Sequence, residues 1–466
     1  MLFTPPKFLQ PIINKVDAVL RPIPGRYGRI FKEYYDLLEK SQWWTKSELE
    51  EYQLSNLKRI IKHAYDNIPY YNRVFKENAI KPEDIKNLED IKKIPFLNKE
   101  IVRKNLSDLI ARNVAKKDTE YVTTGGSTAI PVGLFIEKKT NLIRFAFEWR
   151  AWNWMDYHFR EPCVVLRGRV LKNRISLYDP VNNYLILSAY KMTEDNLKKY
   201  LDLINGFRPK IIRAYPSSAT VLARYIKEKK IKFNQEGFLK AISTSSENLY
   251  DSQRNFLEQA YRCKVFDKYG NSEQATILGE CAKHEGYHDF MEYSLTELVD
   301  TKGNDIKEEG GSGEIVSTVF TNRAMPLIRY RSEDLATYTN KLCSCGRKLK
   351  LYSEIIGRKQ EMIITKLGNL ITMTALIFAT HSPIFKNVKQ FQFIQNEPGK
   401  LLLKIIKNDS YAREDTNTIL QELENKLEKQ LTIQLQFVNE IPLTPRGKYR
   451  FLIQNLPIDT FENHEK

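Results

Sequence analysis

Strand-like and helix-like segments alternate along the chain between residues 120 and 266. In segment 140–154, apolar side chains recur at spacings of three and four, which predicts a helix. Short apolar runs between such segments predict strands. The predicted strands are 120–122, 132–136, 162–166, 210–214, 239–244 and 264–266, and the other predicted helices are 196–205, 217–229 and 252–261. This order predicts an α/β fold with parallel sheet covered by helices, and ligands outside the carboxyl ends of the strands.

The pattern changes on both sides of this region. Residues 1 to about 120 are rich in helical patterns, and a β-rich stretch begins at Gly310. After Arg358 the predicted order is strand, helix, two strands, helix and strand (362–365, 372–380, 389–393, 401–406, 412–430 and 432–438). A chain of 466 residues is too long for one ordinary core. We therefore expect a large domain over residues 1–357 and a small α+β domain over residues 358–466.

Composition and charge narrow the class of protein. A hydrophobic content of 42% with 11% aromatic residues excludes a disordered chain. The net charge of +16 suits anionic partners such as ATP, coenzyme A or an anionic membrane surface. Nucleic acid is not favoured, because Lys and Arg are spread along the chain and no nucleic-acid motif occurs. No signal peptide pattern opens the chain and the five cysteines do not suggest a disulfide framework, so we expect a cytoplasmic protein.

Two apolar segments raise the question of membrane contact. The uncharged run 367–385 contains Gly368, Asn369, His381 and Pro383, and it fits a buried strand and helix better than a membrane span. Segment 8–20 predicts an amphipathic helix beyond Pro11. Core packing is its favoured role, and a peripheral membrane contact is the alternative. The oligomeric state is not predicted.

A loop rich in glycine and hydroxyl groups follows the strand 120–122. Glycines allow the backbone to approach an anion, and hydroxyl and N–H groups donate hydrogen bonds to phosphate oxygens. The spacing is not that of a G-x-x-x-x-G-K-[ST] loop, which excludes a P-loop NTPase. The pattern alone leaves phosphate binding and a plain polar turn open. The loop residues are Thr123, Thr124, Gly125, Gly126, Ser127 and Thr128.

Further motifs follow this loop in a fixed order: Tyr269-Gly270-Asn271-Ser272-Glu273, RYRSEDL at 329–335, Gly357-Arg358, and Pro445-Arg446-Gly447-Lys448. Together the set resembles the adenylate-forming superfamily of acyl-CoA synthetases, peptide-synthetase adenylation domains and luciferases. The Cys-Ser-Cys-Gly-Arg segment at 343–347 makes the resemblance closest to phenylacetate–coenzyme A ligases and their capsule-biosynthesis relatives.

The resemblance implies an ATP-dependent ligase with a large AMP-binding domain and a small mobile C-terminal lid. The enzyme would join a small-molecule carboxylic acid to AMP and then pass the acyl group to coenzyme A. Lys448 would stabilise the charge that develops between the carboxylate and the α-phosphate, and Glu273 would hold Mg²⁺. The loop 123–128 would hold the β- and γ-phosphates of ATP.

The remaining nucleotide contacts are also implied by the resemblance. Tyr269 would stack on adenine, Asp334 would accept hydrogen bonds from the ribose, and Arg358 would support the same nucleotide. The other residues at matching positions are Ser245, Ser246, Glu247, Gly270, Asn271 and Ser272.

These residues also allow plainer interpretations. Tyr269 could be a core tyrosine, Glu273 an acid at a helix start, and Asp334 half of a surface pair with Arg331. Lys448 could be one solvated lysine among many.

The chain departs from the family pattern at two positions. Ala129 replaces a glycine late in the loop, and Gln360 replaces an aspartate at the hinge. The first change could tune ATP affinity, and the second puts in doubt how the lid rotates. Neither change removes a charged catalytic group, so the enzyme interpretation stands.

The cysteines suggest a separate metal site. Cys281, His288, Cys343 and Cys345 supply three sulfurs and one imidazole, the donor set of a closed structural zinc site. The phenylacetate ligase branch has Cys and His at matching places. His284 is the competing imidazole, and unliganded reduced cysteines are the alternative.

The acid and the acceptor are not predicted. A pocket would be lined by parts of 215–217, 243–247 and Tyr269, where Arg167 and Arg169 could meet an anionic substrate or could be surface arginines. The acceptor could be coenzyme A, or an amine or hydroxyl group of a sugar. A nucleotide-binding protein without turnover is the third hypothesis.

Overall fold

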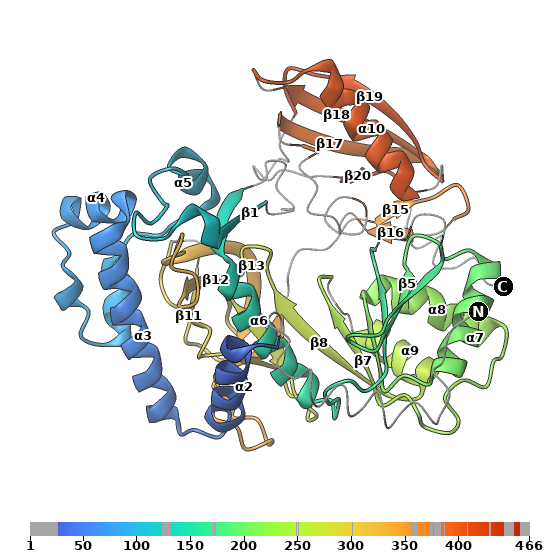
Figure 1. Cartoon of the computed structure of the whole chain (residues 1–466), viewed down its shortest axis with the longest axis horizontal. Helices are drawn as coiled ribbons and strands as arrows, with labels where there is room; N and C mark the ends of the chain where they lie inside the picture. Colours follow the sequence, from blue (N-terminus) through green and yellow to red (C-terminus); the bar gives the residue numbers. More distant parts are fainter. Residues whose placement is uncertain are drawn as a thin grey trace. The chain divides into compact units, whose positions relative to one another are not determined.

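The computed structural model describes residues 27–123, 132–169, 171, 174–247, 249, 251–300, 302–355, 362–368, 370–372, 376, 384–385, 387–407, 409–427, 430–441 and 452–456 (Figure 1). The chain forms two compact units. The first draws on Met1–Tyr121, Phe135–His158 and Lys268–Ile355. The second draws on Val122–Leu134, Phe159–Asp267 and Ile356–Lys466.

The first unit combines helices with an antiparallel sheet. Its helices are α2 (Arg29–Ser41), α3 (Lys46–Asn67), α4 (Pro69–Glu77), α5 (Lys99–Lys104) and α6 (Lys138–Asn153), with 3₁₀ turns at Pro82–Asp84, Leu88–Lys93 and Lys116–Asp118. Its strands are β9 (Ile277–Glu280), β10 (Tyr287–Asp289), β11 (Ser294–Val299), β12 (Ser312–Val319), β13 (Tyr330–Tyr338) and β14 (Leu351–Ile355). The order is β11-β12-β13-β14-β10-β9, and Lys268, Tyr269 and Gly270 of β8 (Lys264–Gly270) pair with β9. Each neighbouring pair is antiparallel.

A buried ion pair connects α2 and α6 to the sheet region. Arg150 Nη2 and Nη1 donate to the two Glu292 carboxylate oxygens at 2.7 and 2.9 Å, and both side chains are fully buried. The Nη2 group also donates to the Leu38 carbonyl at 2.9 Å. Because a charge left alone in the interior is costly, neither partner can be removed without loss of stability.

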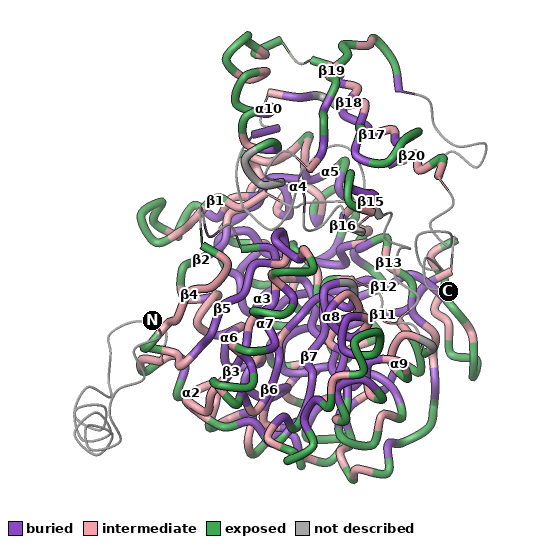
Figure 2. The backbone as a smooth tube through the Cα atoms, turned by 90° about the vertical axis from the view of Figure 1, so that its right-hand side faces the viewer, coloured by how far each residue is buried: buried purple, intermediate pink, exposed green. Residues whose placement is uncertain are grey.

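The second unit contains the predicted parallel sheet. Strands β7 (Ala241–Ser245), β6 (Ile211–Ala214), β3 (Cys163–Arg167) and β5 (Tyr184–Ser188) run parallel in that order, and β4 (Ser176–Asp179) closes the edge antiparallel. Helices α7 (Glu194–Phe207), α8 (Pro216–Glu228) and α9 (Asp251–Tyr261) pack with it in one apolar core. The trace of these strands is mostly buried in Figure 2. The parallel sheet with its helices is therefore confirmed.

The C-terminal part of the second unit contains a four-stranded sheet in the order β19-β18-β17-β20, and its apolar core cluster also includes Tyr190 and Tyr215. The elements are β15 (Met362–Ile364), β16 (Leu370–Thr372), β17 (Val388–Glu397), β18 (Lys400–Lys407), α10 (Arg413–Leu427), β19 (Thr432–Phe437) and β20 (Leu452–Gln454). The predicted strands and the second predicted helix are found here. Most of the predicted helix 372–380 lies outside the described residues.

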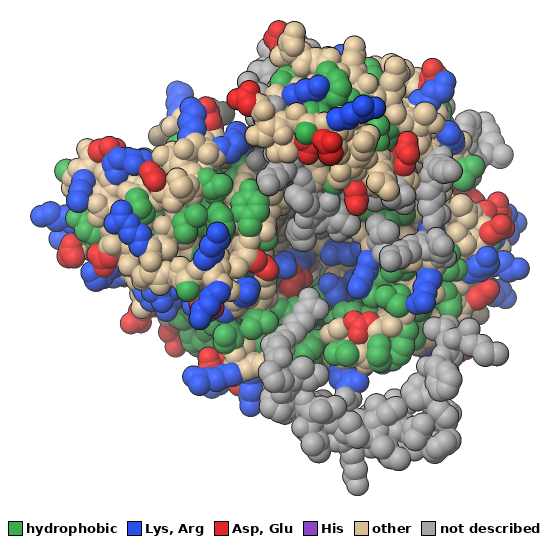
Figure 3. Space-filling model, turned by 45° about the horizontal axis from the view of Figure 1, so that its top comes forward, with side chains coloured by type: hydrophobic (Ala, Val, Ile, Leu, Met, Phe, Trp, Pro, Cys, Tyr) green, Lys and Arg blue, Asp and Glu red, His purple; other side chains and the backbone are tan. Residues whose placement is uncertain are grey.

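Three smaller observations bear on the predictions. Strands β1 (Thr119–Thr123) and β2 (Gly133–Glu137) form a two-stranded sheet. Within the described residues, none of the helices combines the length and the apolar character that crossing a membrane requires. Lys and Arg side chains are spread among acidic ones over the face drawn in Figure 3, as their spread along the sequence suggested.

Candidate functional site

The first group of predicted site residues lies at the end of β8 and on β13. Tyr269 is the penultimate residue of β8, and its hydroxyl donates a hydrogen bond to Asp334 Oδ2 at 2.8 Å. Burial, and then the Asp334 charge, raise the pKa of Tyr269 well above its usual value. The hydroxyl therefore stays protonated and holds the carboxylate in one orientation.

Asp334 does not form the surface pair with Arg331 that the plainer interpretation required. Arg331 Nε donates instead to Glu314 Oε2 at 2.8 Å, across the β12–β13 pair. The Ser332 hydroxyl accepts a hydrogen bond from the Asp334 backbone at 3.1 Å. The carboxylate of Asp334 thus accepts a hydrogen bond from Tyr269 and does not pair with Arg331.

Glu273 follows the turn after β8 and is buried, with 9% of its surface exposed. The Tyr330 hydroxyl donates to its Oε1 at 3.0 Å. Burial raises the pKa of Glu273, and the positive charge of Lys99 offsets part of this rise. A carboxylate held by a tyrosine is a fitting ligand for Mg²⁺, which commonly takes one or two protein carboxylates together with phosphate oxygens.

The other residues of the β8 turn have structural contacts. Asn271 Oδ1 accepts a hydrogen bond from the Ala275 backbone at 2.8 Å, which closes the turn. Gly270 and Ser272 are exposed. The turn thus leaves two small exposed positions beside the buried Glu273.

The second group lies at the carboxyl edge of the parallel sheet. Ser245 ends β7 and is buried, whereas Ser246 is exposed and has φ of +74°. Arg167, the last residue of β3, donates to the Ser245 hydroxyl. Its guanidinium also lies 5.2 Å from the centroid of the Tyr215 ring, which directly follows β6. Glu247 lies close enough for its charge to raise the pKa of Tyr215, although burial is the larger cause.

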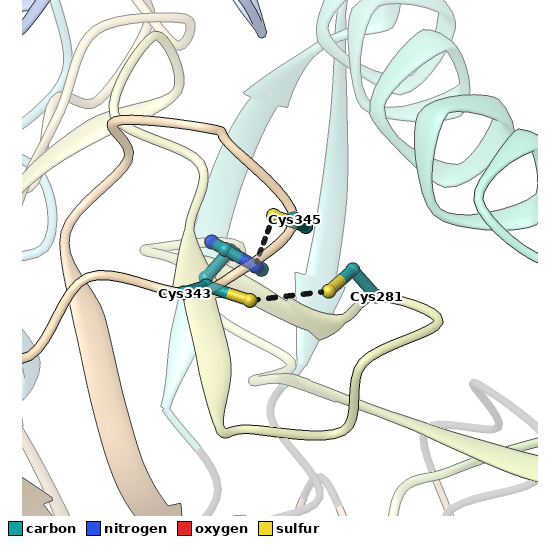
Figure 4. Close-up of side chains that lie close together, drawn as sticks. Cys281, Cys343 and Cys345 are labelled. Carbon is teal, nitrogen blue, oxygen red and sulfur yellow. Dashed lines mark hydrogen bonds between the residues drawn. The ribbon is translucent and has the colours of Figure 1, made fainter.

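The four predicted metal ligands come together in the first unit. Cys281 follows β9, His288 lies on β10, and Cys343 and Cys345 lie on the connection from β13 to β14. Their ligand atoms all lie within 4.8 Å of one another, and the three cysteine side chains point toward one another in Figure 4. The Cys281 and Cys343 sulfurs are 3.5 Å apart, and Cys345 Sγ is 3.6 Å from His288 Nε2.

These distances fit a tetrahedral zinc site. With Zn–S near 2.3 Å and Zn–N near 2.0 Å, a regular tetrahedron has S–S edges of about 3.8 Å and S–N edges of about 3.5 Å. A disulfide would need a sulfur separation of about 2.05 Å. His284, the competing imidazole, pairs through Nδ1 with Glu280 Oε2 at 3.6 Å. His288 is therefore the histidine that faces the cysteines.

The environment of the sulfurs favours a thiolate. Burial would raise the pKa of Cys345, but hydrogen bonds from His288 and Arg347 outweigh it and lower the pKa to about 5. Gly346 has φ of +90°, a conformation that suits glycine at this tight turn. Burial raises the pKa of Cys343, so a bound cation would be needed to hold this second sulfur as a thiolate.

Arg347 connects the loop that carries Cys343 and Cys345 to Gln42, in the turn between α2 and α3. Its Nε and Nη2 donate to Gln42 Oε1 at 3.0 and 2.9 Å, and Trp154 Nε1 donates to the same oxygen at 2.9 Å. The guanidinium lies between two indole rings, 4.6 Å from Trp43 and 4.4 Å from Trp154. The Trp154 ring in turn meets the His288 ring edge to face at 5.4 Å.

Several predicted residues lie outside the described part of the chain. They are Thr124, Gly125, Gly126, Ser127, Thr128, Ala129, Arg358, Gln360 and Lys448. Thr123 is described as the last residue of β1. The roles assigned to all site residues stay predictions.

Three residues in these sites were not predicted from the sequence. Tyr330 binds Glu273, Lys99 pairs with Glu333 at 2.9 Å beside it, and Arg347 joins the metal loop to Gln42. For Tyr330 a signal was present: Tyr330, Ser332 and Asp334 alternate along a predicted β segment, so they share a face. Lys99 and Arg347 carried no such signal.

Comparisons with known proteins find relatives along most of the chain. The family described as CapK C-terminal domain matches residues 363–455. Protein CapK of Staphylococcus aureus is 26% identical over 459 residues, which cover 92% of this chain and 95% of that protein. Phenylacetate-coenzyme A ligase of Thermus thermophilus is 26% identical over 393 residues, which cover 81% of this chain and 85% of the relative.

Solved structures with the same fold include 2-hydroxyisobutyryl-CoA ligase in complex with 2-HIB-AMP and CoA in the thioesterification state. The TM-score is 0.60 at 20% identity, covering 90% of this chain and 92% of that one. An open conformation of the same ligase gives a TM-score of 0.55 at 20% identity, covering 89% and 95%. The predicted resemblance is thus confirmed: along most of its length the chain is similar to CapK and to phenylacetate–coenzyme A ligases, and it has the fold of the adenylate-forming acyl-CoA ligases.

Proposed function

We propose that this protein activates a carboxylic acid with ATP as an acyl-adenylate and then transfers the acyl group to coenzyme A. The observation that carries the proposal is the set of contacts at the end of β8. There Tyr269 holds Asp334, and Tyr330 holds the buried Glu273, at the motif positions of the adenylate-forming enzymes. The similarity to phenylacetate–coenzyme A ligases over most of the chain supports the same reaction.

The chemistry divides among these residues. Mg²⁺ on Glu273 would neutralise the phosphates of ATP, and Asp334 would accept hydrogen bonds from the ribose hydroxyls. Lys448, outside the described residues, would stabilise the charge that develops as the carboxylate attacks the α-phosphate. The cysteine and histidine set would hold a structural zinc ion, because four protein ligands leave no open position for catalysis.

Exchange of labelled pyrophosphate into ATP in the presence of candidate acids tests the first half-reaction. We expect exchange that depends on both the acid and Mg²⁺, and an acyl-CoA with AMP as products when coenzyme A is added. Glu273→Gln should abolish most of the exchange. Glu309→Gln, which changes an exposed carboxylate bonded to Thr339 in the same unit, is the matched control. A protein that binds ATP but shows no exchange with any acid would overturn the proposal.

A second candidate acceptor is an amine or a hydroxyl group of a surface polysaccharide sugar. The observation that favours it is the similarity to CapK, which covers 92% of this chain. Product analysis separates the two acceptors. If the acyl-adenylate accumulates in the presence of coenzyme A but is consumed when a sugar is added, the sugar acceptor is supported. Either reaction uses ATP, which agrees with a cytoplasmic location for the protein.

A further inference from the structure

Arg329, the residue directly before β13, is the centre of a buried set of contacts in the first unit. Its side chain is 5% exposed. Nε and Nη2 donate to Glu297 Oε1 at 3.1 and 2.7 Å, and Nη1 donates to the carbonyls of Lys92 and Ile94 at 3.2 and 2.9 Å. The guanidinium also lies 3.9 Å from the centroid of the Phe96 ring. All three nitrogens of the planar fork therefore join β11 to the segment that precedes α5.

The backbone of Arg329 holds the same segment from a second side. Its carbonyl accepts a hydrogen bond from the Leu97 N–H at 3.0 Å, and the Arg331 N–H donates to the Leu97 carbonyl at 2.9 Å. Leu97 and Tyr330 therefore form a parallel bridge. The Arg329 N–H donates to the Thr318 hydroxyl at 2.9 Å. Arg329 has φ of +50°, a conformation that is costly for a residue with a side chain, and it persists because these contacts hold it.

This arrangement sets the direction of Tyr330. Arg329 and Arg331, on either side of it, both face the Phe96 ring, with their guanidinium groups 3.9 and 5.5 Å from its centroid. Side chains alternate along a strand, so Tyr330 faces the opposite side, where its hydroxyl donates to Glu273 Oε1 at 3.0 Å. Tyr330 and Glu273 are both buried. A shift of the backbone at Arg329 would therefore move the donor that holds Glu273.

We infer that Arg329 is a positioning residue for the magnesium site: through Tyr330 it fixes the Glu273 carboxylate in the orientation that binds Mg²⁺. The inference rests on the proposed function and adds to it a residue that acts through another. A partner that orients a metal ligand raises the affinity for the metal, because the ligand loses less conformational freedom on binding. A purely structural role would give Arg329 an effect on stability without an effect on metal affinity.

A titration of the full-length protein with Mn²⁺, in the presence of a non-hydrolysable ATP analogue, tests the inference. Mn²⁺ takes oxygen ligands as Mg²⁺ does, and its electron paramagnetic resonance signal reports binding without turnover. Tyr330→Phe should raise the Kd for Mn²⁺ by about ten- to hundredfold, the usual cost of losing a side chain that orients a metal ligand. Arg329→Lys keeps the charge but loses the planar fork, and it should raise the Kd by about tenfold. The Mg²⁺ concentration that half-saturates pyrophosphate exchange should rise by a similar factor.

Arg150→Lys is the matched control. Arg150 and Glu292 also form a buried ion pair in the first unit, and Arg150 likewise donates to a backbone carbonyl. This variant should lower the thermal midpoint, as Arg329→Lys does, but leave the Mn²⁺ affinity unchanged. A double variant that combines Arg329→Lys with Tyr330→Phe should bind Mn²⁺ no more weakly than Tyr330→Phe alone, because Arg329 acts through Tyr330.

The outcomes separate the inference from the proposed function. If Arg329→Lys weakens Mn²⁺ binding no more than Arg150→Lys does, or if its effect simply adds to that of Tyr330→Phe, the inference is overturned and the proposed function stays intact. Wild-type protein that binds no Mn²⁺ also overturns the inference. If no acid supports exchange, the proposed function fails, and the Mn²⁺ titration alone decides on Arg329. If circular dichroism shows that Arg329→Lys is unfolded, Thr318→Val takes its place and should weaken Mn²⁺ binding in the same way, since it removes the hydroxyl that accepts from the Arg329 N–H.

Discussion

Replacing Asp334 with asparagine should weaken ATP binding while leaving the fold intact. The side chain keeps its shape, and its remaining oxygen can still accept the hydrogen bond that Tyr269 donates at 2.8 Å. What is lost is the charge on the acceptor of the ribose hydroxyls. Hydrogen bonds to charged groups contribute about 1.5–3 kcal/mol, so the Kd for ATP should rise by roughly ten- to hundredfold. The thermal midpoint should change little, because the hydrogen bond from Tyr269 is kept.

Isothermal titration with a non-hydrolysable ATP analogue measures this effect. A second readout is the ionisation of Tyr269: the Asp334 charge is a cause of its raised pKa, so the asparagine variant should lower that pKa, as followed by ultraviolet absorbance. Asp300→Asn is the matched control, because Asp300 is a half-buried acid that accepts hydrogen bonds from its own turn. Unchanged ATP affinity in a folded Asp334→Asn protein would refute the assignment and leave Asp334 a structural partner of Tyr269.

Three further results are expected. Purified protein should carry about one zinc ion per chain. Cys343→Ser should lower the zinc content and the thermal midpoint more than it lowers pyrophosphate exchange per folded molecule. Protein that is prepared without chelator and contains no zinc would exclude the site. Lys448→Ala should slow acyl-adenylate formation by roughly a hundredfold or more while sparing transfer from supplied acyl-adenylate, and equal loss of both steps would contradict a moving lid. Arg150→Met should cost about 3–5 kcal/mol near pH 7, because it leaves Glu292 charged and buried. Burial would raise the pKa of Glu292, but the charge and hydrogen bonds of Arg150 lower it overall. The stability that the Arg150–Glu292 pair contributes is therefore present above the usual glutamate pKa and is lost as the pH falls. If the thermal midpoint of the variant lies equally far below that of the wild type near pH 4 and near pH 7, this sign is wrong.

The sequence predicted the parallel sheet because its strands are buried on both faces and read as short apolar runs between amphipathic helices. Strands β3, β6 and β7 were found in this way. Strand β5 was missed, although all five of its residues are buried. It is preceded by strand β4 and not by a helix, so it does not fit the alternation of strands and helices that identified the others. Its neighbour β4 pairs with it antiparallel, and an alternating strand–helix pattern does not predict such an edge.

The antiparallel sheet of the first unit was harder to predict, because its partners are far apart in sequence. Strand β10 lies between β9 and β14, and its pairing with Leu351 and Tyr352 spans more than sixty residues. The predicted metal ligands show the same limit: Cys281 meets Cys343 across 62 positions. Residue type singled out the four residues that the structure brings together, whereas the contacts of Tyr330 and Lys99 depend on strand neighbours that local sequence does not reveal.

Arg347 lies against two indole rings, those of Trp43 and Trp154, so its position should affect tryptophan fluorescence. Trp43 is 58% exposed, so its emission responds to water and to the cation stacked on it. Arg347 follows Cys345 by two residues and lies 4.4 Å from the Trp154 ring, so we expect an ion bound at the predicted site to restrain this cation as well. We therefore expect zinc binding at the predicted site to change the tryptophan fluorescence, so that uptake can be tested without an added dye.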